Sequence, residues 1–180
     1  MKGIVFTEFL EMVEKKFDYE MVDDILTMQD LPSSGIYSAV GTYSHGEMVT
    51  LVNNLHEKTD IPLPVLLETF GEYLFSSLHK AYGGLFSHVT SGLELLNSIE
   101  EHIHVQVKKL YPDAELPTFN VLEKSSDKIV MEYYSERKMG DLAVGLMRGC
   151  MKHFNEEATI EKDMISEDGK KVKFTVTMNK

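Results

Sequence analysis

Two groups of side chains in this 180-residue chain could do chemistry together. The first is a pair of histidines, His102 and His104. Two histidines that share a metal ion on one helix stand three or four residues apart, so this spacing does not suit a shared ion. One imidazole on one iron is the metal-binding arrangement that remains. For either histidine alone, the ordinary alternative is a place at the solvent edge of a helix.

The second group is Tyr133, Ser135 and Arg137, which occupy alternate positions. If a strand runs through all three, their side chains share a face, because alternate residues of a strand point the same way. Two hydroxyl groups and a guanidinium at one spot suit a carboxylate or a phosphate, since arginine presents a planar pair of N–H donors. The alternative is a polar strand end that leads into a helix.

Composition limits the class of protein. With 43% hydrophobic residues the chain can bury one sizeable core, so a single domain over residues 1–180 is expected. The formal net charge of −11 disfavours nucleic acid as a partner, because a polyanion requires a basic face. The one cysteine, Cys150, excludes an internal disulfide and is expected to be a buried, inert thiol on an apolar helical face.

The ends and the hydropathy of the chain predict a soluble cytoplasmic protein with no membrane partner. The acidic residue Glu8 comes too early for a signal peptide, and no apolar run approaches the length of a membrane span. A reducing compartment also agrees with the cysteine content.

The first part of the chain predicts helices. Apolar residues recur at helical spacing over 4–17, and a second helix is expected over 19–28. Ser44 and Glu47 form the pattern of a capping box, in which each residue satisfies a backbone N–H of the other, before a helix that ends near Lys58.

A further helix begins at Pro62 and Pro64 and is apolar nearly all round, which indicates a core helix or one that lines a cavity. After a turn at 82–84 helical spacing resumes and runs through both histidines. On a helical wheel, His102 and His104 fall on opposite edges of one apolar arc. Periodicity therefore does not decide which of them faces a pocket.

The last part of the chain predicts strands around one helix. Apolar and polar residues alternate over 119–133 on both sides of a turn at 124–127. Helical spacing returns over 139–154, and strands over 159–165 and 171–178 are expected to pair across an Asp-Gly turn, which supplies residues able to adopt positive φ. Helices segregated from an antiparallel sheet define an α+β fold.

Four short motifs agree in order and spacing with one known family across essentially the whole chain. They are Met1-Lys2-Gly3, Ile103-His104-Val105-Gln106, Pro117 thirteen residues beyond His104, and Tyr133-x-Ser135-x-Arg137 followed by Lys138-Met139. In these motifs the chain resembles the haem-nitric oxide/oxygen binding family, the H-NOX domains, relatives of the haem domain of soluble guanylate cyclase. The resemblance implies that a haem lies buried between an N-terminal helical part and a C-terminal antiparallel sheet packed with helices.

The resemblance also implies roles for single residues. The cofactor would be haem b, iron protoporphyrin IX, with His104 as the axial ligand of the iron, and Pro117 would press on the macrocycle and keep it non-planar. His102 has no role in the family pattern. Three residues would hold the haem propionates: Tyr133, Ser135 and Arg137.

Ligand choice is expected to depend on the other face of the haem. In oxygen-binding family members a tyrosine five residues after the motif arginine donates a hydrogen bond to dioxygen, and this chain has Leu142 there. Dioxygen needs such a donor in a dry pocket, whereas NO binds ferrous haem without one. A five-coordinate ferrous haem that binds NO and CO but not O₂ is therefore predicted. The other implied distal residues are all apolar: Val5, Phe9, Leu74, Leu78 and Leu146.

The function that the resemblance implies is sensing of nitric oxide, not catalysis. NO would weaken or break the bond between the iron and His104, the haem would relax against Pro117, and the helical part would shift. The implied partner is a separate signalling protein, either a sensor histidine kinase of a two-component system or a diguanylate cyclase that makes cyclic-di-GMP. The alternative is a haem enzyme of the peroxidase or NO-consuming type, which needs distal acid–base groups that the apolar residues do not supply.

Overall fold

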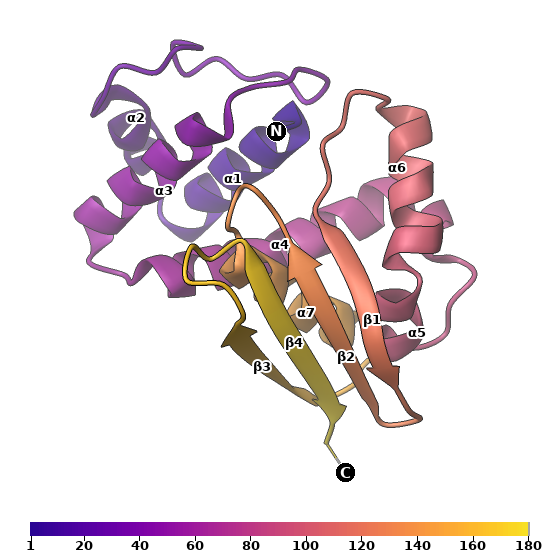
Figure 1. Cartoon of the computed structure of the whole chain (residues 1–180). Helices are drawn as coiled ribbons and strands as arrows, with labels where there is room; N and C mark the ends of the chain where they lie inside the picture. The colour runs from indigo at the N-terminus through magenta and orange to yellow at the C-terminus, as the bar shows by residue number, and fades with distance from the viewer. Residues whose placement is uncertain (180) are drawn as a thin grey trace.

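The protein has a helical half and a half built on a β-sheet, in a computed structural model that describes residues 1–179 (Figure 1). The first half contains α1 (Gly3–Lys16), α2 (Tyr19–Thr27), α3 (His45–Thr59) and α4 (Leu63–Tyr82). The helical segments of the second half are η1 (Gly83–Phe86), α5 (Gly92–Asn97), η2 (Ile99–Ile103), α6 (His104–Leu110) and α7 (Gly140–His153). Its strands are β1 (Thr118–Lys124), β2 (Lys128–Tyr134), β3 (Ala158–Met164) and β4 (Lys171–Met178). These elements confirm the predicted α+β fold.

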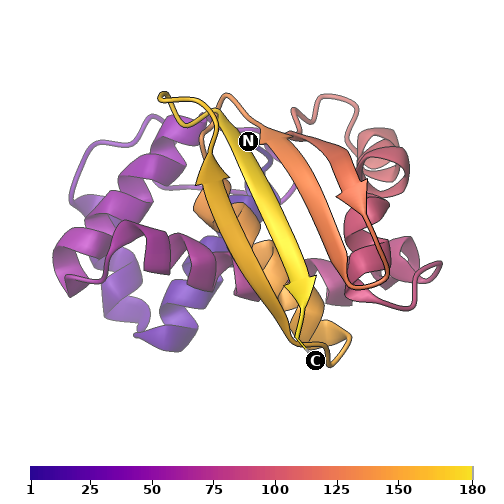
Figure 2. The same ribbon diagram turned by 60° about the horizontal axis from the view of Figure 1, so that its bottom comes forward.

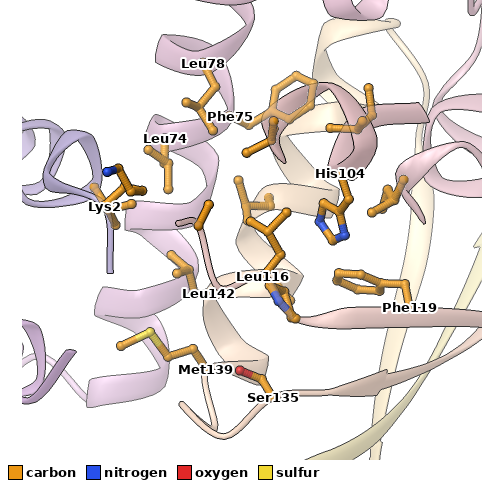
Figure 3. A pocket seen from close by; sticks show the side chains of 18 of the residues that line it. Lys2, Leu74, Phe75, Leu78, His104, Leu116, Phe119, Ser135, Met139 and Leu142 are labelled. Carbon is orange, nitrogen blue, oxygen red and sulfur yellow. The ribbon is translucent and has the colours of Figure 1, made fainter. Parts of the chain in front are cut away.

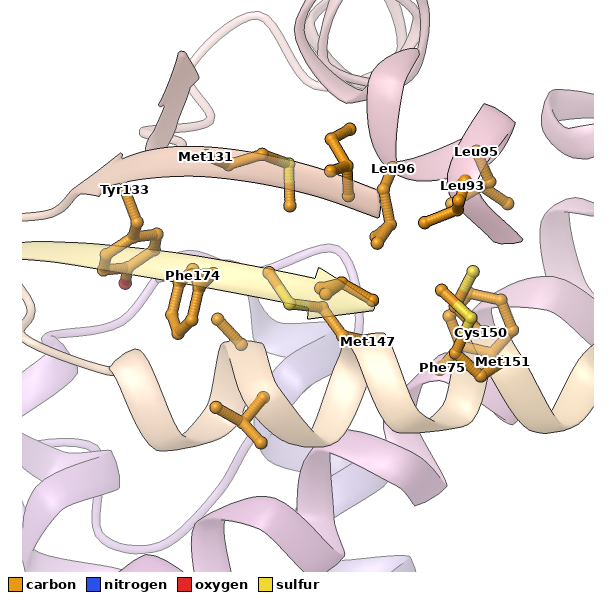
Figure 4. Packing of buried hydrophobic residues seen from close by; sticks show 14 of the residues in the cluster. Phe75, Leu93, Leu95, Leu96, Met131, Tyr133, Met147, Cys150, Met151 and Phe174 are labelled. Carbon is orange, nitrogen blue, oxygen red and sulfur yellow. The ribbon is translucent and has the colours of Figure 1, made fainter. Parts of the chain in front are cut away.

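The four strands form one antiparallel sheet in the order β1-β2-β4-β3. Both predicted hairpins are present, and the turn between β3 and β4 places its positive φ of +77° at Gly169. Helix α7 lies behind the sheet when the strands face the viewer (Figure 2). Between them Met147 of α7 and Phe174 of β4 lie in one buried cluster (Figure 4). The sheet half therefore has its own apolar core.

A second apolar cluster fills the helical half, and α4 contributes to both clusters. Phe70 and Leu74 of α4 belong to the core with α1 and α3, whereas Phe75 belongs to the core with α7 and the sheet. A helix shared by two cores must be apolar nearly all round, which explains the composition of α4. Within residues 1–179, none of the helices combines the length and the apolar character that crossing a bilayer demands.

The predicted capping box at the start of α3 is only half right. Ser44 does cap the helix, since its hydroxyl accepts the N–H of Gly46 at 3.2 Å. Glu47 turns instead towards the preceding loop, where its carboxylate accepts the N–H and the hydroxyl of Ser33 and the hydroxyl of Tyr37 at 3.1, 2.5 and 3.0 Å. Three loop donors hold this buried carboxylate in place, so it does not return to the cap.

Helices α4 and α7 approach so closely that glycine is required at the crossing. A Cβ added to Gly145 would lie 2.1 Å from the carbonyl oxygen of Glu68, and a Cβ added to Gly71 would lie 2.4 Å from that of Leu142. Backbone atoms cannot yield as a flexible side chain can. Ion pairs between Glu68 and Arg148 and between Glu72 and Lys152 join the same two helices.

We expect Gly145→Ala to lower the free energy of unfolding by about 1–3 kcal/mol, because the added methyl group must push two helix backbones apart. Urea denaturation followed by circular dichroism measures this change. Gly84→Ala is the control, since nothing lies within 4 Å of a Cβ at Gly84; its effect should stay within about 0.5 kcal/mol. Equal effects of the two substitutions would contradict the close approach.

Candidate functional site

A cavity of about 330 Å³ lies where the helical half meets the sheet half (Figure 3). This volume falls within the roughly 300–1,000 Å³ of cofactor and small-molecule pockets. Most of its lining is apolar and comes from α1, α4, α5, α6 and α7, together with the segment 114–117 and β1. A few polar side chains join this lining: Lys2, Tyr82, His104, Tyr111, Glu115, Tyr133, Ser135 and Arg137.

A π-helical turn, η2, places His104 on the cavity wall. In this turn the N–H of Ile103 donates to the carbonyl of Ser98 at 3.2 Å, and that of His104 donates to the carbonyl of Ile99, five residues earlier. A π turn advances by a smaller angle per residue than an α-helix, so one wheel over the whole segment does not apply. The structure thus decides between the two histidines.

His102 lies outside this cavity, as expected for a residue without a role in the family pattern. Its ring packs against that of His88, with 3.7 Å between the two ring centroids.

The imidazole of His104 is held from one side by Glu100. Its Nδ1 lies 3.0 Å from Oε1 of Glu100, and only 14% of the His104 side chain is exposed. Burial lowers the pKa of His104, although the nearby carboxylate of Glu100 acts to raise it, so the ring is neutral at pH 7. Because a carboxylate accepts hydrogen bonds, the proton is on Nδ1. The Nε2 lone pair is therefore left to bind a metal.

Tyr133, Ser135 and Arg137 all line the cavity, but not as one strand face. Strand β2 ends at Tyr134, and a turn follows in which the N–H of Arg137 donates to the Ser135 hydroxyl at 3.2 Å. The structure therefore shows the alternative, a polar strand end that leads through a turn into α7. Burial raises the pKa of Tyr133, so its hydroxyl stays protonated as a donor.

The guanidinium of Arg137 faces the loop before β1. It donates to the carbonyl oxygen of Glu115 at 2.7 Å and to the carboxylate of Glu115 at 3.0 Å, and 87% of the Glu115 side chain is exposed. Lys2 also lines the cavity and pairs with Asp113 at 3.2 Å. Two cations therefore stand beside an apolar cavity, with acidic partners that are well exposed.

A family model described as Haem-NO-binding matches residues 2–162, which is most of the chain. The chain belongs to the H-NOX family. H-NOX proteins are haem-based gas sensors that bind haem and gases such as NO and CO. No curated protein sequence matches the chain.

Solved H-NOX structures resemble this one over nearly their whole length. The Fe(II) unliganded H-NOX protein from K. algicida is 48% identical, with a TM-score of 0.96 over 100% of this chain and 97% of that one. The H-NOX from Shewanella woodyi, in an Fe(II)CO state bound to IWP-051, is 37% identical, with a TM-score of 0.84 over 99% and 95%. The S. oneidensis H-NOX in the Fe(II)NO state, 23% identical with a TM-score of 0.92 over 100% of both chains, shares the fold.

The structure of this H-NOX chain brings together five of the six predicted distal residues. These residues line the cavity from α1, α4 and α7: Val5, Leu74, Leu78, Leu142 and Leu146. Phe9 does not line the cavity: it is fully buried in the helical core, with its ring edge-on to that of Phe70 and 5.1 Å between the ring centroids. Helix α1 approaches the cavity with its first turn, from which Ile4 and Val5 line it.

Tyr82 is the residue of α4 in the cavity lining of this H-NOX chain that carries a hydroxyl. It lies 2.8 Å from the hydroxyl of Tyr111, and this contact together with burial raises the pKa of Tyr82 to about 12. The hydroxyl of Tyr82 is thus protonated and shares one hydrogen bond with that of Tyr111, in which either hydroxyl can be the donor. Leu142, at the position of the family tyrosine, contributes only carbon to the lining.

Sequence reasoning found the position of Pro117 in this H-NOX chain but missed Glu100. Pro117 lines the cavity directly before β1, as the family motif led us to expect. Glu100 stands four residues before His104, a spacing at which helical side chains meet. That spacing was the one available signal, and the π turn between the two residues obscured it.

Cys150 is buried, as the sequence predicted, with 1% of its surface exposed. Burial raises the pKa of its thiol to about 12, so at pH 8 almost none of it is thiolate. Only the thiolate reacts readily with iodoacetamide. We expect alkylation of the folded protein at pH 8 to be at least ~100-fold slower than in urea, because both access and ionisation are lost. Mass spectrometry measures this rate, and equal rates would contradict the burial.

Proposed function

We propose that residues 1–180 form one domain that binds haem b, with Nε2 of His104 on the iron, and that this domain senses nitric oxide. One observation carries the proposal: a neutral imidazole, fixed through Nδ1, stands in the wall of an apolar cavity between the two halves. Haem iron in sensors of this kind needs one such ligand and an apolar pocket around the ring.

The other side chains of the cavity fit the same cofactor. Haem is a planar apolar ring with two carboxylates, and Tyr133, Ser135 and Arg137 offer two hydroxyl groups and a guanidinium to them. A propionate can replace the exposed carboxylate of Glu115 on Arg137, which costs little because that ion pair is open to solvent. Pro117, in the wall next to β1, would contact the ring.

The distal lining supports selection of NO and CO over O₂. Dioxygen on ferrous haem gains negative charge and is held by a hydrogen-bond donor in a dry pocket. Val5, Leu74 and Leu142 offer none.

The haem, when bound, would supply an iron that can take up NO. His104 would hold that iron, Glu100 and the surrounding packing would fix His104 in the cavity wall, and Pro117 would contact the ring. NO shifts the conformation of the protein only if it binds one arrangement of these residues more tightly than another. We propose that the resulting shift of the helical half regulates a separate sensor histidine kinase or diguanylate cyclase.

Absorption spectra of the reduced protein, recorded alone and then with NO, CO or air, test the proposal. We expect the spectrum to change with NO and with CO and to stay constant in air over minutes. A protein that is colourless after expression with sufficient haem would contradict haem binding. A reversible spectral change in air would contradict the predicted selectivity, and peroxidase turnover with a reducing dye would favour an enzyme.

A further inference from the structure

One carboxylate oxygen joins His104 to the sheet. Oε1 of Glu100 lies 3.0 Å from Nδ1 of His104 and accepts the backbone N–H of Phe119 at 2.7 Å. Glu100 lies in the π turn, and Phe119 is the second residue of β1. The two donors thus belong to different elements, on either side of the loop that contains Pro117.

The backbone N–H of Phe119 is available to Glu100, because pairing within the sheet does not require it. Strand β1 is at the edge of the sheet, and there Phe119 pairs with Tyr133 of β2. An N–H that points away from the partner strand at such an edge needs water or a side chain as its acceptor. Glu100 supplies this acceptor and thereby fixes the start of β1 to the helix of His104.

We propose that Glu100 is a positioning residue for His104 and couples that histidine to β1. This inference rests on the proposed ligation of iron by His104. The carboxylate holds the proton on Nδ1, orients the ring so that Nε2 faces the cavity, and makes the imidazole a stronger donor to the metal. Because Phe119 shares the oxygen, a displacement of His104 is passed to the first residues of β1.

An ordinary surface pair between Glu100 and a histidine would not have these properties. The exposed fraction of the His104 side chain is 14%, so this contact is shielded from solvent on the histidine side. Glu101, the neighbouring acid, is exposed and makes no hydrogen bond from its side chain among residues 1–179. The contact with His104 and Phe119 therefore depends on the position of Glu100, and an acidic residue elsewhere in the same segment does not make it.

Resonance Raman spectroscopy of the unliganded ferrous protein tests the proposal through the iron–imidazole stretching vibration. We expect Glu100→Ala to move this band to lower frequency and to speed transfer of haem to an acceptor globin by roughly 10- to 100-fold. Glu100→Gln should give a smaller shift, since its amide oxygen can accept both hydrogen bonds without the charge. Glu101→Gln is the control with the same change in charge, and its band should not move.

Amide hydrogen exchange supplies a second readout that does not depend on the iron–imidazole bond. The N–H of Phe119 should exchange faster in Glu100→Ala than in the unchanged protein or in Glu101→Gln. If Glu100→Ala does not fold, as judged by circular dichroism, Glu100→Gln carries the test alone.

An unchanged band in both Glu100 variants, or an equal shift in Glu101→Gln, would overturn the role of Glu100. A different result would overturn the proposed function instead: an iron–imidazole band that is absent from the unchanged protein, or one that survives in His104→Gly. The two failures are therefore distinguishable.

Discussion

Replacement of His104 by glycine is expected to lower the affinity for haem by at least ~100-fold, since loss of a partner of a metal-binding histidine already costs 10- to 100-fold and loss of the ligand itself costs more. The cavity is otherwise apolar near this ring, and the propionate contacts remain. Haem content per chain and the rate of haem transfer measure the change. Imidazole added to the medium should restore binding, because it can occupy the space that the side chain leaves.

His102→Gly is the matched control for His104→Gly. It removes an imidazole from the same helical segment, two residues away, but one that packs against His88 outside the cavity. Its haem content should be unchanged. When imidazole fills the site of His104→Gly, the iron would no longer be attached to the helix, so the signalling protein proposed as partner should respond to this variant as it is proposed to respond to NO. A His104→Gly protein with unchanged colour and unchanged gas responses would contradict iron ligation by His104.

The second large effect is expected from Leu142→Tyr. Leu142 lines the cavity from α7 at the position where oxygen-binding relatives carry a tyrosine. A hydroxyl donor at this point would face a ligand on the iron in an apolar, water-poor space. A hydrogen bond to a charged group contributes about 1.5–3 kcal/mol, which is roughly 10- to 150-fold in affinity for O₂. We expect the variant to change its spectrum reversibly in air.

Leu142→Phe separates the hydroxyl from the size of the ring. It adds an aromatic ring of nearly the same volume without a donor, so its affinity for O₂ should remain as low as that of the unchanged protein. Titration of the reduced proteins with O₂, with NO binding measured alongside, makes the comparison. Equal O₂ affinities in the two variants would mean that the distal donor does not decide ligand choice here.

The sequence by itself determined the order of helices and strands, because each depends on local periodicity, capping and turn residues. Ser44 caps α3 as predicted, Pro62 precedes α4, and the Asp-Gly turn joins β3 to β4. The family motifs likewise pointed to His104 and Arg137, and both residues line the cavity. Composition alone indicated one sizeable core, whereas the folded chain has two apolar clusters.

Tertiary structure decided what depends on contacts between distant elements. The π turn selected His104 over His102 by shifting the phase of the helix, which no regular periodicity can represent. Because α1 packs closely on α4, Phe9 lies in the core of the helical half, whereas Ile4 lines the cavity. Glu100 accepts the N–H of Phe119 only because β1 lies beside it in the folded chain. The position of a carboxylate such as that of Glu100, or of a phenyl ring such as that of Phe9, depends on contacts with residues distant in sequence. Spacing along the chain does not specify those contacts.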